Sequence, residues 1–249
     1  MRAIGVIPAR WASTRFPGKP LALLCGRPLL YWVVRRAQRA RRLSDLLVAT
    51  DDDRIFAAAV ALDVEAVMTS TAHPSGTDRV AEAVRGREAD IVINLQGDEP
   101  LVDPELVDHL VETLSSGGWE MATAACPIED EATAHNPSVV KVVRAADGAA
   151  LYFSRAMIPF WRDRGPADPF PEGVYLRHIG LYGYRRPFLE RFVARPPSLL
   201  EQYEKLEQLR ALEMGCRMHV AIVHHPGIGV DTPEDVALAE AALRAAGET

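Results

Sequence analysis

Three cationic side chains, Arg10, Arg15 and Lys19, stand within ten residues of one another in the run RWASTRFPGKP at 10–20. Guanidinium groups bind phosphate through paired hydrogen bonds, and a lysine adds a compact positive charge. Backbone amides near Gly18 offer a small anion nest. The alternative is a surface loop that is basic without a function. We expect a phosphate-binding loop, because the run directly follows an apolar segment that is typical of a strand.

The two commonest phosphate-binding motifs are absent from this loop. A Walker A loop needs Ser or Thr after Gly-Lys, and here Pro20 follows Lys19. A dinucleotide-binding turn needs G-x-G-x-x-G at this point, and the sequence has none. A nicotinamide-dependent dehydrogenase, which would share an alternation of strands and helices, is therefore disfavoured.

Two aspartates are candidate metal ligands. Asp98 lies in the run NLQGDEP, just past an apolar strand, and Asp231 lies in GIGVDTPED. Mg²⁺ commonly takes one or two protein carboxylates and completes its shell with phosphate oxygens and water. Read singly, each aspartate has a structural alternative. Thr232 is a good N-cap and Pro233 a good first residue for a closing helix, so Asp231 could simply belong to the helix entry.

The run MTSTAHPSGTDR at 68–79 is a candidate binding segment for a nucleoside. Its small hydroxyl side chains and its glycine allow a flat base and a ribose to approach closely. The helix N-terminus that follows favours an anion. A plain loop before a capped helix is the alternative, and His73 by itself is not evidence for a catalytic base.

The second half of the chain contributes candidates for binding an acceptor. Arg155 ends an expected strand, His178 and Tyr182 lie on another, and Glu207 and Gln208 lie on an expected helix. An arginine and a histidine that converge on one cavity suit a ligand with a carboxylate and several hydroxyl groups. Core or surface roles are the alternative for all five residues.

Short apolar runs and amphipathic stretches alternate through the first half of the chain. This order predicts a mostly parallel sheet covered by helices, whose strand ends build the ligand site. The expected strands are 3–7, 46–49, 66–68 and 91–95, and the expected helices are 28–40, 53–62, 78–84 and 104–114.

The second half differs, because several strands follow one another without full helices between them. Some of these strands should pair antiparallel. The run at 162–173 contains prolines and glycines and indicates a mobile loop. The expected strands are 121–125, 139–144, 150–154, 178–184 and 218–223, and the expected helices are 199–214 and 233–246.

The composition narrows the class of protein. The chain has 249 residues and a formal net charge of −6, whereas a nucleic-acid binder usually shows a strong basic excess. No apolar run approaches about 18 residues, so we expect no membrane insertion. Cys25, Cys126 and Cys216 are far apart and odd in number, which fits free thiols in a reducing cytoplasm. The arginine-rich run at 35–42 is interpreted as a solvated helix face.

Taken together, the motifs resemble those of the 3-deoxy-manno-octulosonate cytidylyltransferases, also called CMP-Kdo synthetases. The resemblance runs from about residue 4 to about residue 239, and its motifs are long and in order. The runs that carry it are IPARWASTRFPGKPL, ATDD, TSTAHPSGTDRVAEA, INLQGDEP, NPSVVKVV, ALYFSRAMIP, HIGLYGYR, EKLEQLRALEMG and GVDTPEDV.

The resemblance implies a fold and a reaction. The fold is the three-layer α/β fold of nucleotide-diphospho-sugar transferases, with a mixed, mostly parallel central sheet and a smaller antiparallel subregion. It would form a single domain over 1–249, with a nucleotide-binding half at about 1–120, sugar-binding and dimerisation elements at about 121–230 and a closing helix at 233–246. The reaction moves CMP from CTP to 3-deoxy-D-manno-octulosonate (Kdo), giving CMP-Kdo and pyrophosphate for lipopolysaccharide biosynthesis. The implied enzyme is a Mg²⁺-dependent cytoplasmic homodimer.

The resemblance also implies roles for individual residues. Arg10, Arg15 and Lys19 would hold the triphosphate and act in catalysis with Asp98, while Asp98 and Asp231 match the Mg²⁺ ligands. The positions that match the nucleotide site are Ala9, Arg10, Lys19, Ser70, Ser75, Gly76 and Arg79. The positions that match the sugar site are Gln96, Arg155, His178, Tyr182, Glu207 and Gln208.

Two positions depart from the family pattern, and two functional alternatives stay open. Ser138 stands where a second asparagine is expected and Met157 where a proline is expected, and neither carries a chemical role. One alternative is a sibling cytidylyltransferase that acts on 8-amino-Kdo or a sialic acid. The other is a regulatory module that binds CTP without turnover, and the pairing of Asp98 with Asp231 argues against it.

Overall fold

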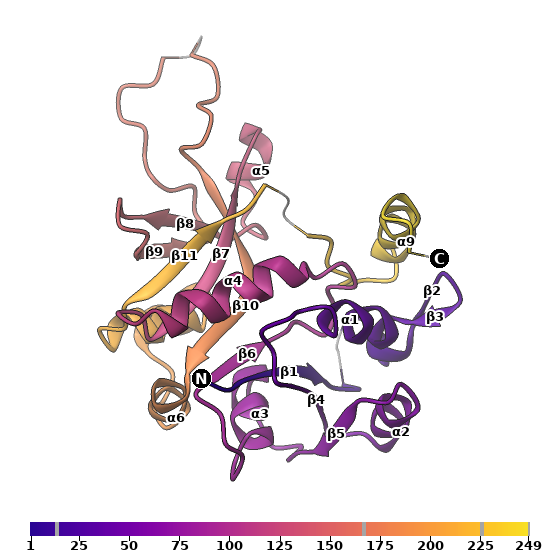
Figure 1. Ribbon diagram of the computed structural model, residues 1–249. Helices are drawn as coiled ribbons and strands as arrows, with labels where there is room; N and C mark the ends of the chain where they lie inside the picture. Colours follow the sequence, from indigo (N-terminus) through magenta and orange to yellow (C-terminus); the bar gives the residue numbers. More distant parts are fainter. Residues whose placement is uncertain (13–14, 166–167, 225–226, 249) are drawn as a thin grey trace. The chain divides into compact units, whose positions relative to one another are not determined.

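The computed structural model describes residues 1–12, 15–165, 168–224 and 227–248. The chain divides into two compact units (Figure 1). The first unit comprises Met1–Ser115 and Gly227–Thr249, and the second comprises Ser116–Pro226. The division after Ser115 lies close to the expected end of the nucleotide-binding half, and the single domain stays a prediction.

The first unit contains a parallel sheet with the strand order β6-β1-β4-β5. Its central strand, β1, is almost entirely buried, as expected for a strand with neighbours on both sides and helices packed against the sheet. The alternation of strands and helices predicted for this half is confirmed. The strands are β1 (Ala3–Ala9), β4 (Asp45–Thr50), β5 (Glu65–Met68) and β6 (Ile91–Asn94).

Helices connect these strands and pack on them. Helix α3 packs against β1 and β4, α2 against β4 and β5, and α4 against β6. Side chains cap two of the helices, since Asp52 accepts from the Arg54 amide at the start of α2 and Ser75 from the Asp78 amide at the start of α3. The helices are α1 (Leu29–Ala37), α2 (Asp53–Ala61), α3 (Gly76–Ala83), α4 (Pro104–Ser115) and α9 (Asp235–Ala245).

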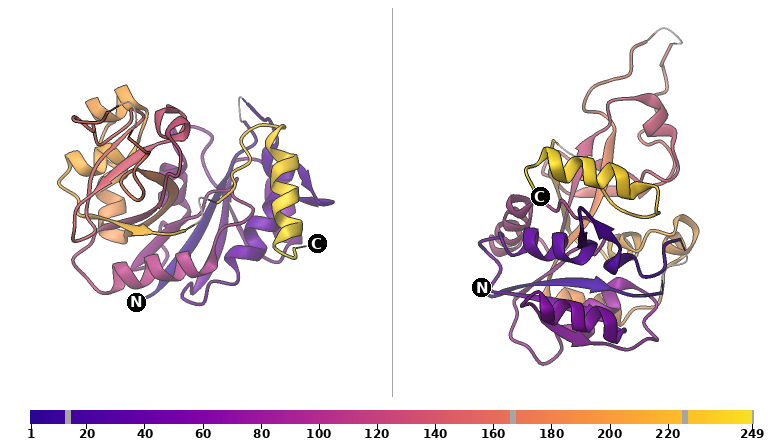
Figure 2. Two further views of the ribbon diagram at one scale, coloured as in Figure 1. Left: turned by 90° about the horizontal axis from the view of Figure 1, so that it is seen from above. Right: turned by 90° about the vertical axis from the view of Figure 1, so that its right-hand side faces the viewer.

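The sequence did not indicate two short elements that lie between β1 and α1. A 3-10 turn, η1 (Lys19–Leu21), leads into a small hairpin of β2 (Leu23–Leu24) and β3 (Arg27–Pro28). The hairpin lies beside α9, the closing helix, as Figures 1 and 2 show. The amide of Cys25 in the hairpin turn donates to Glu240 of α9 at 2.7 Å. The closing helix is thereby attached to the segment that follows the cationic loop.

The arginine-rich run at the end of α1 contacts acidic side chains. Arg36 Nη1 donates to Glu248 Oε1 at 3.1 Å, and Arg39 Nη2 donates to Glu248 Oε2 at 2.8 Å. Arg42 forms an ion pair with Glu112 of α4. Arg35, Arg39, Arg41 and Arg42 are exposed, as the interpretation as a solvated face expects. The run extends past α1, which ends at Ala37, and three of its five arginines form ion pairs with carboxylates far along the chain.

Loss of the Glu248 contact should lower stability in a pH-dependent way. We expect Glu248→Gln to lower the free energy of unfolding by about 1 kcal/mol near neutral pH. The hydrogen bonds from Arg39 and Arg36 lower the pKa of Glu248 below its usual 4.5, despite partial burial. A lowered carboxyl pKa stabilises the folded chain above the unfolded pKa, and this contribution is lost as the pH falls through the folded value.

Urea unfolding across a pH series tests this prediction. The difference between wild type and Glu248→Gln should be present above pH 4.5 and shrink below it. The exposed Glu172, changed to Gln, is the control and should leave the pH dependence unaltered. A difference between wild type and Glu248→Gln that stays constant with pH would contradict the role given to this carboxylate.

The second unit contains the antiparallel pairing that the sequence predicts. Strand β10 pairs antiparallel with β7 and with β8, β8 pairs antiparallel with β9, and β11 pairs parallel with β7. The expected fold class is confirmed. The strands are β7 (Met121–Pro127), β8 (Lys141–Arg144), β9 (Ala150–Ser154), β10 (Leu176–Arg185) and β11 (Met218–Ile222), and the helices are α5 (Glu131–His135), α6 (Arg186–Val193), α7 (Leu199–Glu204) and α8 (Gln208–Glu213).

The single helix expected at 199–214 is wrong. Helix α7 ends at Glu204, Lys205 takes a left-handed conformation with φ 54°, and α8 begins at Gln208. A continuous helix would need the Glu204 carbonyl to accept from the Gln208 amide. Instead, Arg155 Nε donates to that carbonyl at 2.7 Å. A side chain from another element therefore occupies the acceptor that the helix would use.

Other expectations for the chain differ in smaller ways. Helices α5 and α6 were not expected, and the closing helix begins at Asp235 rather than 233. The described residues of 162–173 form no helix or strand, and 166–167 lie outside the described residues. The three cysteines are free thiols. Within the described part of the chain, no helix is both long enough and apolar enough to span a bilayer.

Candidate functional site

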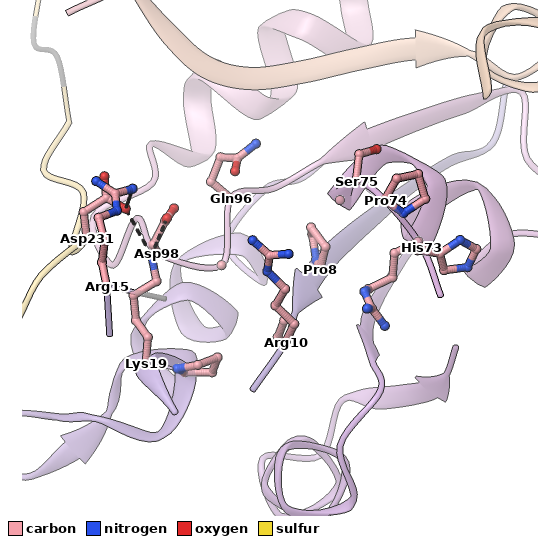
Figure 3. Close-up of a pocket in the computed structure, with 15 residues that line it drawn as sticks. Pro8, Arg10, Arg15, Lys19, His73, Pro74, Ser75, Gln96, Asp98 and Asp231 are labelled. Carbon is pink, nitrogen blue, oxygen red and sulfur yellow. Dashed lines mark hydrogen bonds and ion pairs between the residues drawn. The ribbon is translucent and has the colours of Figure 1, made fainter. Parts of the chain in front are cut away.

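A cavity of about 310 Å³ opens in the first unit where β1 ends (Figure 3). It receives side chains from the cationic loop, from the start of α3, from the segment after β6 and from the segment before α9. These are loops at the carboxyl ends of parallel strands, where the α/β pattern places ligand sites. The sequence-predicted residues that line it are Ala9, Arg10, Arg15, Lys19, Ser75, Gly76, Arg79, Gln96, Asp98 and Asp231.

Gly97 allows the segment after β6 to pass against the end of β1. A Cβ atom built on Gly97 would lie 2.7 Å from the carbonyl oxygen of Pro8, which is backbone and has little room to move. The neighbouring residues Gln96 and Asp98 both line the cavity. The close backbone approach at Gly97 therefore positions two predicted site residues.

Gly97→Ala should destabilise the first unit and distort the cavity. We expect the free energy of unfolding to fall by about 1–3 kcal/mol, the usual cost of overpacking against a rigid neighbour. Gly229→Ala is the matched control, since a Cβ there meets no atom within 4 Å. It should change stability by less than about 0.5 kcal/mol. Urea denaturation of both variants tests this prediction. Equal stability of Gly97→Ala and Gly229→Ala would contradict the close approach of Gly97 to the Pro8 carbonyl.

The shape of the cationic loop depends on an aromatic contact. The ring of Trp11 lies so close to Gly18 that a Cβ on Gly18 would fall 2.8 Å from a ring carbon. Gly18 has φ 70°, a left-handed conformation that suits glycine. Its amide donates to the Trp11 carbonyl at 3.0 Å, and the Arg54 guanidinium lies 3.2 Å from the centre of the Trp11 ring. Loop residues 13–14 lie outside the described residues.

Lys19 brings the two predicted metal-binding aspartates together. Its Nζ lies 2.7 Å from Asp98 Oδ2 and 3.3 Å from Asp231 Oδ1, and Figure 3 shows both contacts as dashed lines. Arg15 Nη2 lies 3.0 Å from the same oxygen of Asp231. The amide of Val230 also donates to the Asp98 carbonyl at 2.8 Å. Two carboxylates that are far apart in the sequence therefore contact one ammonium group.

The segment around Asp231 does not enter α9 in the expected way. The Asp235 carboxylate accepts from the amides of Asp231 and Thr232 at 2.9 and 2.8 Å. These bonds, chiefly the one from the Thr232 amide, lower the pKa of Asp235. Thr232 is therefore not the N-cap of the closing helix. Asp235 anchors the turn and leaves the Asp231 side chain directed to Lys19 and Arg15.

The donor set fits a hard divalent cation. Asp98 and Asp231 supply carboxylate oxygens that contact one ammonium group, and both line a cavity that Arg10, Arg15 and Lys19 also line. Within the described residues, no group of three or more His, Cys, Asp and Glu side chains is placed to hold a metal. Two carboxylates are what Mg²⁺ usually takes when phosphate oxygens supply further ligands. The Mg²⁺ assignment stays a prediction.

Arg79 is the buried cation of the segment at 68–79. Its side chain is 4% exposed, and Nη2 lies 2.6 Å from Asp51 Oδ2, while Nη1 donates to Thr69 Oγ1. Burial of a guanidinium requires such partners, because an uncompensated charge away from water is costly. Sequence reasoning missed the role of Asp51. Its position directly after β4, in the run ATDD, was the available signal.

Ser70 does not line the cavity, although Ser75 and Gly76 do. The Ser70 amide instead donates to the Glu82 carboxylate at 2.9 Å. That carboxylate also contacts His73 Nε2, and the two hydrogen bonds, chiefly the one from Ser70, lower the pKa of Glu82. His73 lines the cavity with its ring paired to Glu82. Glu82, which the sequence did not single out, therefore ties the 70–73 segment to α3.

Five of the six residues predicted for the sugar lie in the second unit, whereas Gln96 lines the cavity of the first. Carbonyl groups hold Arg155: its Nε donates to Glu204 O and its Nη1 to Pro137 O at 3.0 Å. The Glu204 carboxylate accepts from the Arg155 amide at 2.9 Å and from Ser154 Oγ at 2.5 Å. Glu204 thus makes the main contacts that position Arg155, and no sequence pattern marked it as a site residue.

Lys141 supports the same region from within the core. Its side chain is fully buried, and Nζ donates to the carbonyls of Asn136, Val139 and Arg155 at 2.9, 2.6 and 2.6 Å. All three ammonium hydrogens therefore have a partner, as a buried lysine requires. Desolvation lowers the pKa of Lys141. The contact joins the 136–139 segment to the end of β9.

His178 and Tyr182 lie close together on β10. Their ring centroids are 5.3 Å apart, and His178 Nε2 lies 2.9 Å from Thr123 Oγ1 of β7. Burial lowers the pKa of His178 to about 3 and raises the pKa of Tyr182. Both side chains are therefore neutral at physiological pH. They can exchange hydrogen bonds with a ligand but do not carry charge toward it.

Glu207 and Gln208 lie at the start of α8. Glu207 Oε1 accepts from Arg210 Nη2 at 2.8 Å, and Gln208 is 4% exposed. Arg210 is itself buried and also pairs with Glu201 at 3.1 Å. Glu207 and Arg210 are three residues apart, the spacing that brings side chains together at the start of a helix.

The chain has close relatives of known family. The sequence profile of the family described as Cytidylyltransferase matches residues 4–220. The 3-deoxy-manno-octulosonate cytidylyltransferase of Syntrophobacter fumaroxidans is 51% identical over 240 residues, which cover 95% of this chain and 94% of that protein. The protein of the same name from Thermodesulfovibrio yellowstonii is 45% identical, with 98% of each chain covered.

Solved structures agree with these relatives. The structure of CMP:2-keto-3-deoxy-manno-octonic acid synthetase complexed with CTP has a TM-score of 0.92 and 40% sequence identity, and the match covers 99% of this chain and 100% of that chain. A cytidylyltransferase from Leptospira borgpetersenii has a TM-score of 0.66 at 17% identity, which shows the fold alone. The chain therefore belongs to the cytidylyltransferase family, among the 3-deoxy-manno-octulosonate cytidylyltransferases.

Proposed function

We propose that the chain transfers CMP from CTP to Kdo and releases pyrophosphate. The observation that carries this proposal is the cavity at the end of β1, where Arg10, Arg15 and Lys19 meet Asp98 and Asp231. The fold around this cavity matches that of a synthetase that was solved with CTP. The product CMP-Kdo would activate the sugar for lipopolysaccharide biosynthesis.

The reaction is an in-line displacement at the α-phosphorus. The anomeric hydroxyl of Kdo forms the new oxygen–phosphorus bond and releases its proton to solvent, and the bond between the α- and β-phosphates breaks as pyrophosphate leaves. The cavity residues give no side chain that must act as a covalent nucleophile. Arg10, Arg15 and Lys19 would hold the triphosphate and offset the charge that grows on the leaving group. Catalysis would then rest on positioning and charge neutralisation.

Asp98 and Asp231 are the side chains that would hold Mg²⁺. A bound cation there would supply positive charge beside the α-phosphate. Lys19 already occupies the space between the two carboxylates and would turn toward phosphate oxygens when CTP is present. Ala9, Ser75, Gly76 and Arg79 would contact the nucleoside, and Ser70 would act only through the segment that Glu82 holds.

We assign the acid sugar to Gln96, Arg155, His178, Tyr182, Glu207 and Gln208 by resemblance. The names of the relatives favour Kdo over 8-amino-Kdo or a sialic acid. A cytoplasmic homodimer is likewise proposed from the resemblance. Light scattering of the purified chain tests the dimer, and a monomer at working concentration would contradict it.

Pyrophosphate release tests the proposed reaction. We expect release with CTP, Mg²⁺ and Kdo, and much slower release when ATP, GTP or UTP replaces CTP. A panel with 8-amino-Kdo and a sialic acid ranks the acceptors. Stabilisation by CTP without pyrophosphate release in the presence of any acid sugar would instead support a regulatory module. Stabilisation by NAD(H) alone would support a dehydrogenase.

A further inference from the structure

Strand β10 carries an irregularity that begins just after His178 and includes Tyr182, the two aromatic residues assigned to the sugar. Ile179 pairs with Ala124 of β7 and Gly183 pairs with Ala122, so three residues of β10 stand opposite a single residue, Thr123. Such bulges bend a strand and redirect its side chains, and they are frequent beside functional sites. The irregularity therefore shapes the part of β10 that presents His178 and Tyr182.

The bulge brings His178 and Tyr182 together. In a regular strand, the Cα atoms of two residues four positions apart lie roughly 13 Å from each other, at about 3.3 Å per residue, and their side chains stand roughly perpendicular to the sheet. Here the two ring centroids are only 5.3 Å apart. The ring of Phe153 from β9 lies edge-on to His178 with a centroid distance of 5.0 Å, so the imidazole is enclosed from another side.

Thr123 closes the bulge. It is fully buried, and its Oγ1 lies 2.9 Å from the Leu181 carbonyl oxygen, 3.1 Å from the Ile179 carbonyl oxygen and 2.9 Å from His178 Nε2. These two carbonyls lie in the stretch where the regular ladder with β7 is interrupted. A buried carbonyl accepts hydrogen bonds, and the Thr123 hydroxyl is placed to donate to these two.

The count of hydrogens then favours one tautomer of the imidazole. A threonine hydroxyl has one hydrogen, and the two carbonyls can only accept. If the Thr123 hydroxyl donated to His178, the lone pairs of Thr123 Oγ1 would face two carbonyl oxygens at hydrogen-bonding distance with no hydrogen between them, which is unfavourable. The favourable arrangement directs the Thr123 hydrogen to the carbonyls and the hydrogen on His178 Nε2 to Thr123 Oγ1. The neutral ring then has no hydrogen on Nδ1, and that nitrogen can only accept.

We propose that Thr123 is a positioning residue that closes the β10 bulge and holds His178 as the Nε2–H tautomer, so that Nδ1 accepts a hydrogen bond from a hydroxyl group of the sugar. The sugar part of this inference rests on the proposed function. On this inference, His178 binds a hydroxyl group of the acceptor sugar and not its carboxylate. A ring nitrogen without a hydrogen can accept a hydrogen bond but cannot donate one to an anion.

Nitrogen-15 NMR of the labelled full chain measures the tautomer directly. Long-range proton–nitrogen correlation distinguishes a protonated ring nitrogen from a bare one, and the His178 signals are those absent from His178→Gln. We expect a protonated Nε2 and a bare Nδ1 at neutral pH. A hydrogen on Nδ1, or a doubly protonated ring, would overturn the inference without any variant of Thr123.

Kinetics of two Thr123 variants test the positioning role. Thr123→Val keeps the branched shape but removes the hydroxyl, so KM for Kdo should rise about tenfold while KM for CTP stays unchanged. Thr123→Ser keeps the hydroxyl and should stay within about twofold of wild type. Stabilisation of Thr123→Val by CTP in a thermal-shift assay shows that the first unit is still folded and able to bind. If the KM for Kdo is unchanged in Thr123→Val, the positioning role of Thr123 is overturned, whichever tautomer His178 adopts in that variant.

The two proposals fail in different ways. If the wild-type chain releases no pyrophosphate with any acid sugar, the proposed function fails, and the tautomer measurement still decides the bond between Thr123 and His178. If wild type turns over Kdo but His178 carries its hydrogen on Nδ1, the proposed function stands and the inference about Thr123 falls.

Discussion

Asp98→Asn is expected to lower the rate of pyrophosphate release by roughly a hundredfold to a thousandfold, the usual cost of losing one group that stabilises developing charge. The change keeps the size of the side chain and removes its negative charge. Asp98 Oδ2 lies 2.7 Å from Lys19 Nζ, which places the lost charge at the centre of the predicted metal and phosphate site. Apparent affinity for Mg²⁺ should fall as well, because an amide oxygen is a weaker ligand for a hard cation than a carboxylate.

A titration of Mg²⁺ at saturating CTP and Kdo measures both effects. Asp163→Asn is the control, since Asp163 is 92% exposed in the loop of the second unit and should leave turnover unchanged. CTP-induced stabilisation of Asp98→Asn would confirm that the cavity still forms. Near wild-type turnover of Asp98→Asn at saturating Mg²⁺ would refute the assignment of this carboxylate to the metal.

Lys19→Met should also reduce turnover by roughly a hundredfold or more, but with the opposite effect on the metal. Lys19 is the most enclosed of the three cations, with a side chain 14% exposed against 65% for Arg15. The substitution removes the positive charge that would bind the triphosphate. It also leaves Asp98 and Asp231 without the ammonium group that lies between them. Two facing carboxylates attract a divalent cation more strongly, so the Mg²⁺ concentration needed for half-maximal rate should not rise.

The graded set Lys19→Met, Arg15→Met and Arg85→Met separates position from charge. All three lose one positive charge, but Arg85 is an exposed residue outside the lining of the cavity and should behave as wild type. Arg15→Met should lose less rate than Lys19→Met, because its exposed guanidinium is screened by solvent. Equal losses in Arg15→Met and Lys19→Met, or a weakened Mg²⁺ response in Lys19→Met, would count against the arrangement.

The sequence predicted much of the first unit because the signals there are local. The apolar run of β1 and the amphipathic stretches that became α2 and α4 follow the two side-chain periods of strands and helices, and each can be recognised within about ten residues. The cationic loop and the aspartate after β6 follow from the same pattern, since functional side chains gather at the carboxyl ends of parallel strands.

The helix break at Glu204 shows what local signals cannot contain. Residues 199–214 have an amphipathic helical pattern, and nothing within them marks a stop at Lys205. The stop comes from Arg155, which is 49 residues away in the sequence and donates to the Glu204 carbonyl. Helix propensity is worth a few tenths of a kcal/mol per residue, whereas a hydrogen bond from a charged group such as this guanidinium contributes about 1.5–3 kcal/mol. The tertiary contact therefore decided the backbone.

The cationic loop at 10–20 illustrates what the sequence alone determined and what only the tertiary structure decided. The sequence by itself determined that Arg10, Arg15 and Lys19 gather at a strand end and that their chemistry suits phosphate. Only the tertiary structure decided that Lys19 meets both Asp98 and Asp231, that Gly97 fits the end of β1, and that Thr123 holds the bulge of β10. The physical reason is that periodicity and charge are properties of neighbouring residues, whereas ion pairs, close approaches and the sharing of one hydroxyl hydrogen depend on which distant segments the packed chain brings within about 3 Å.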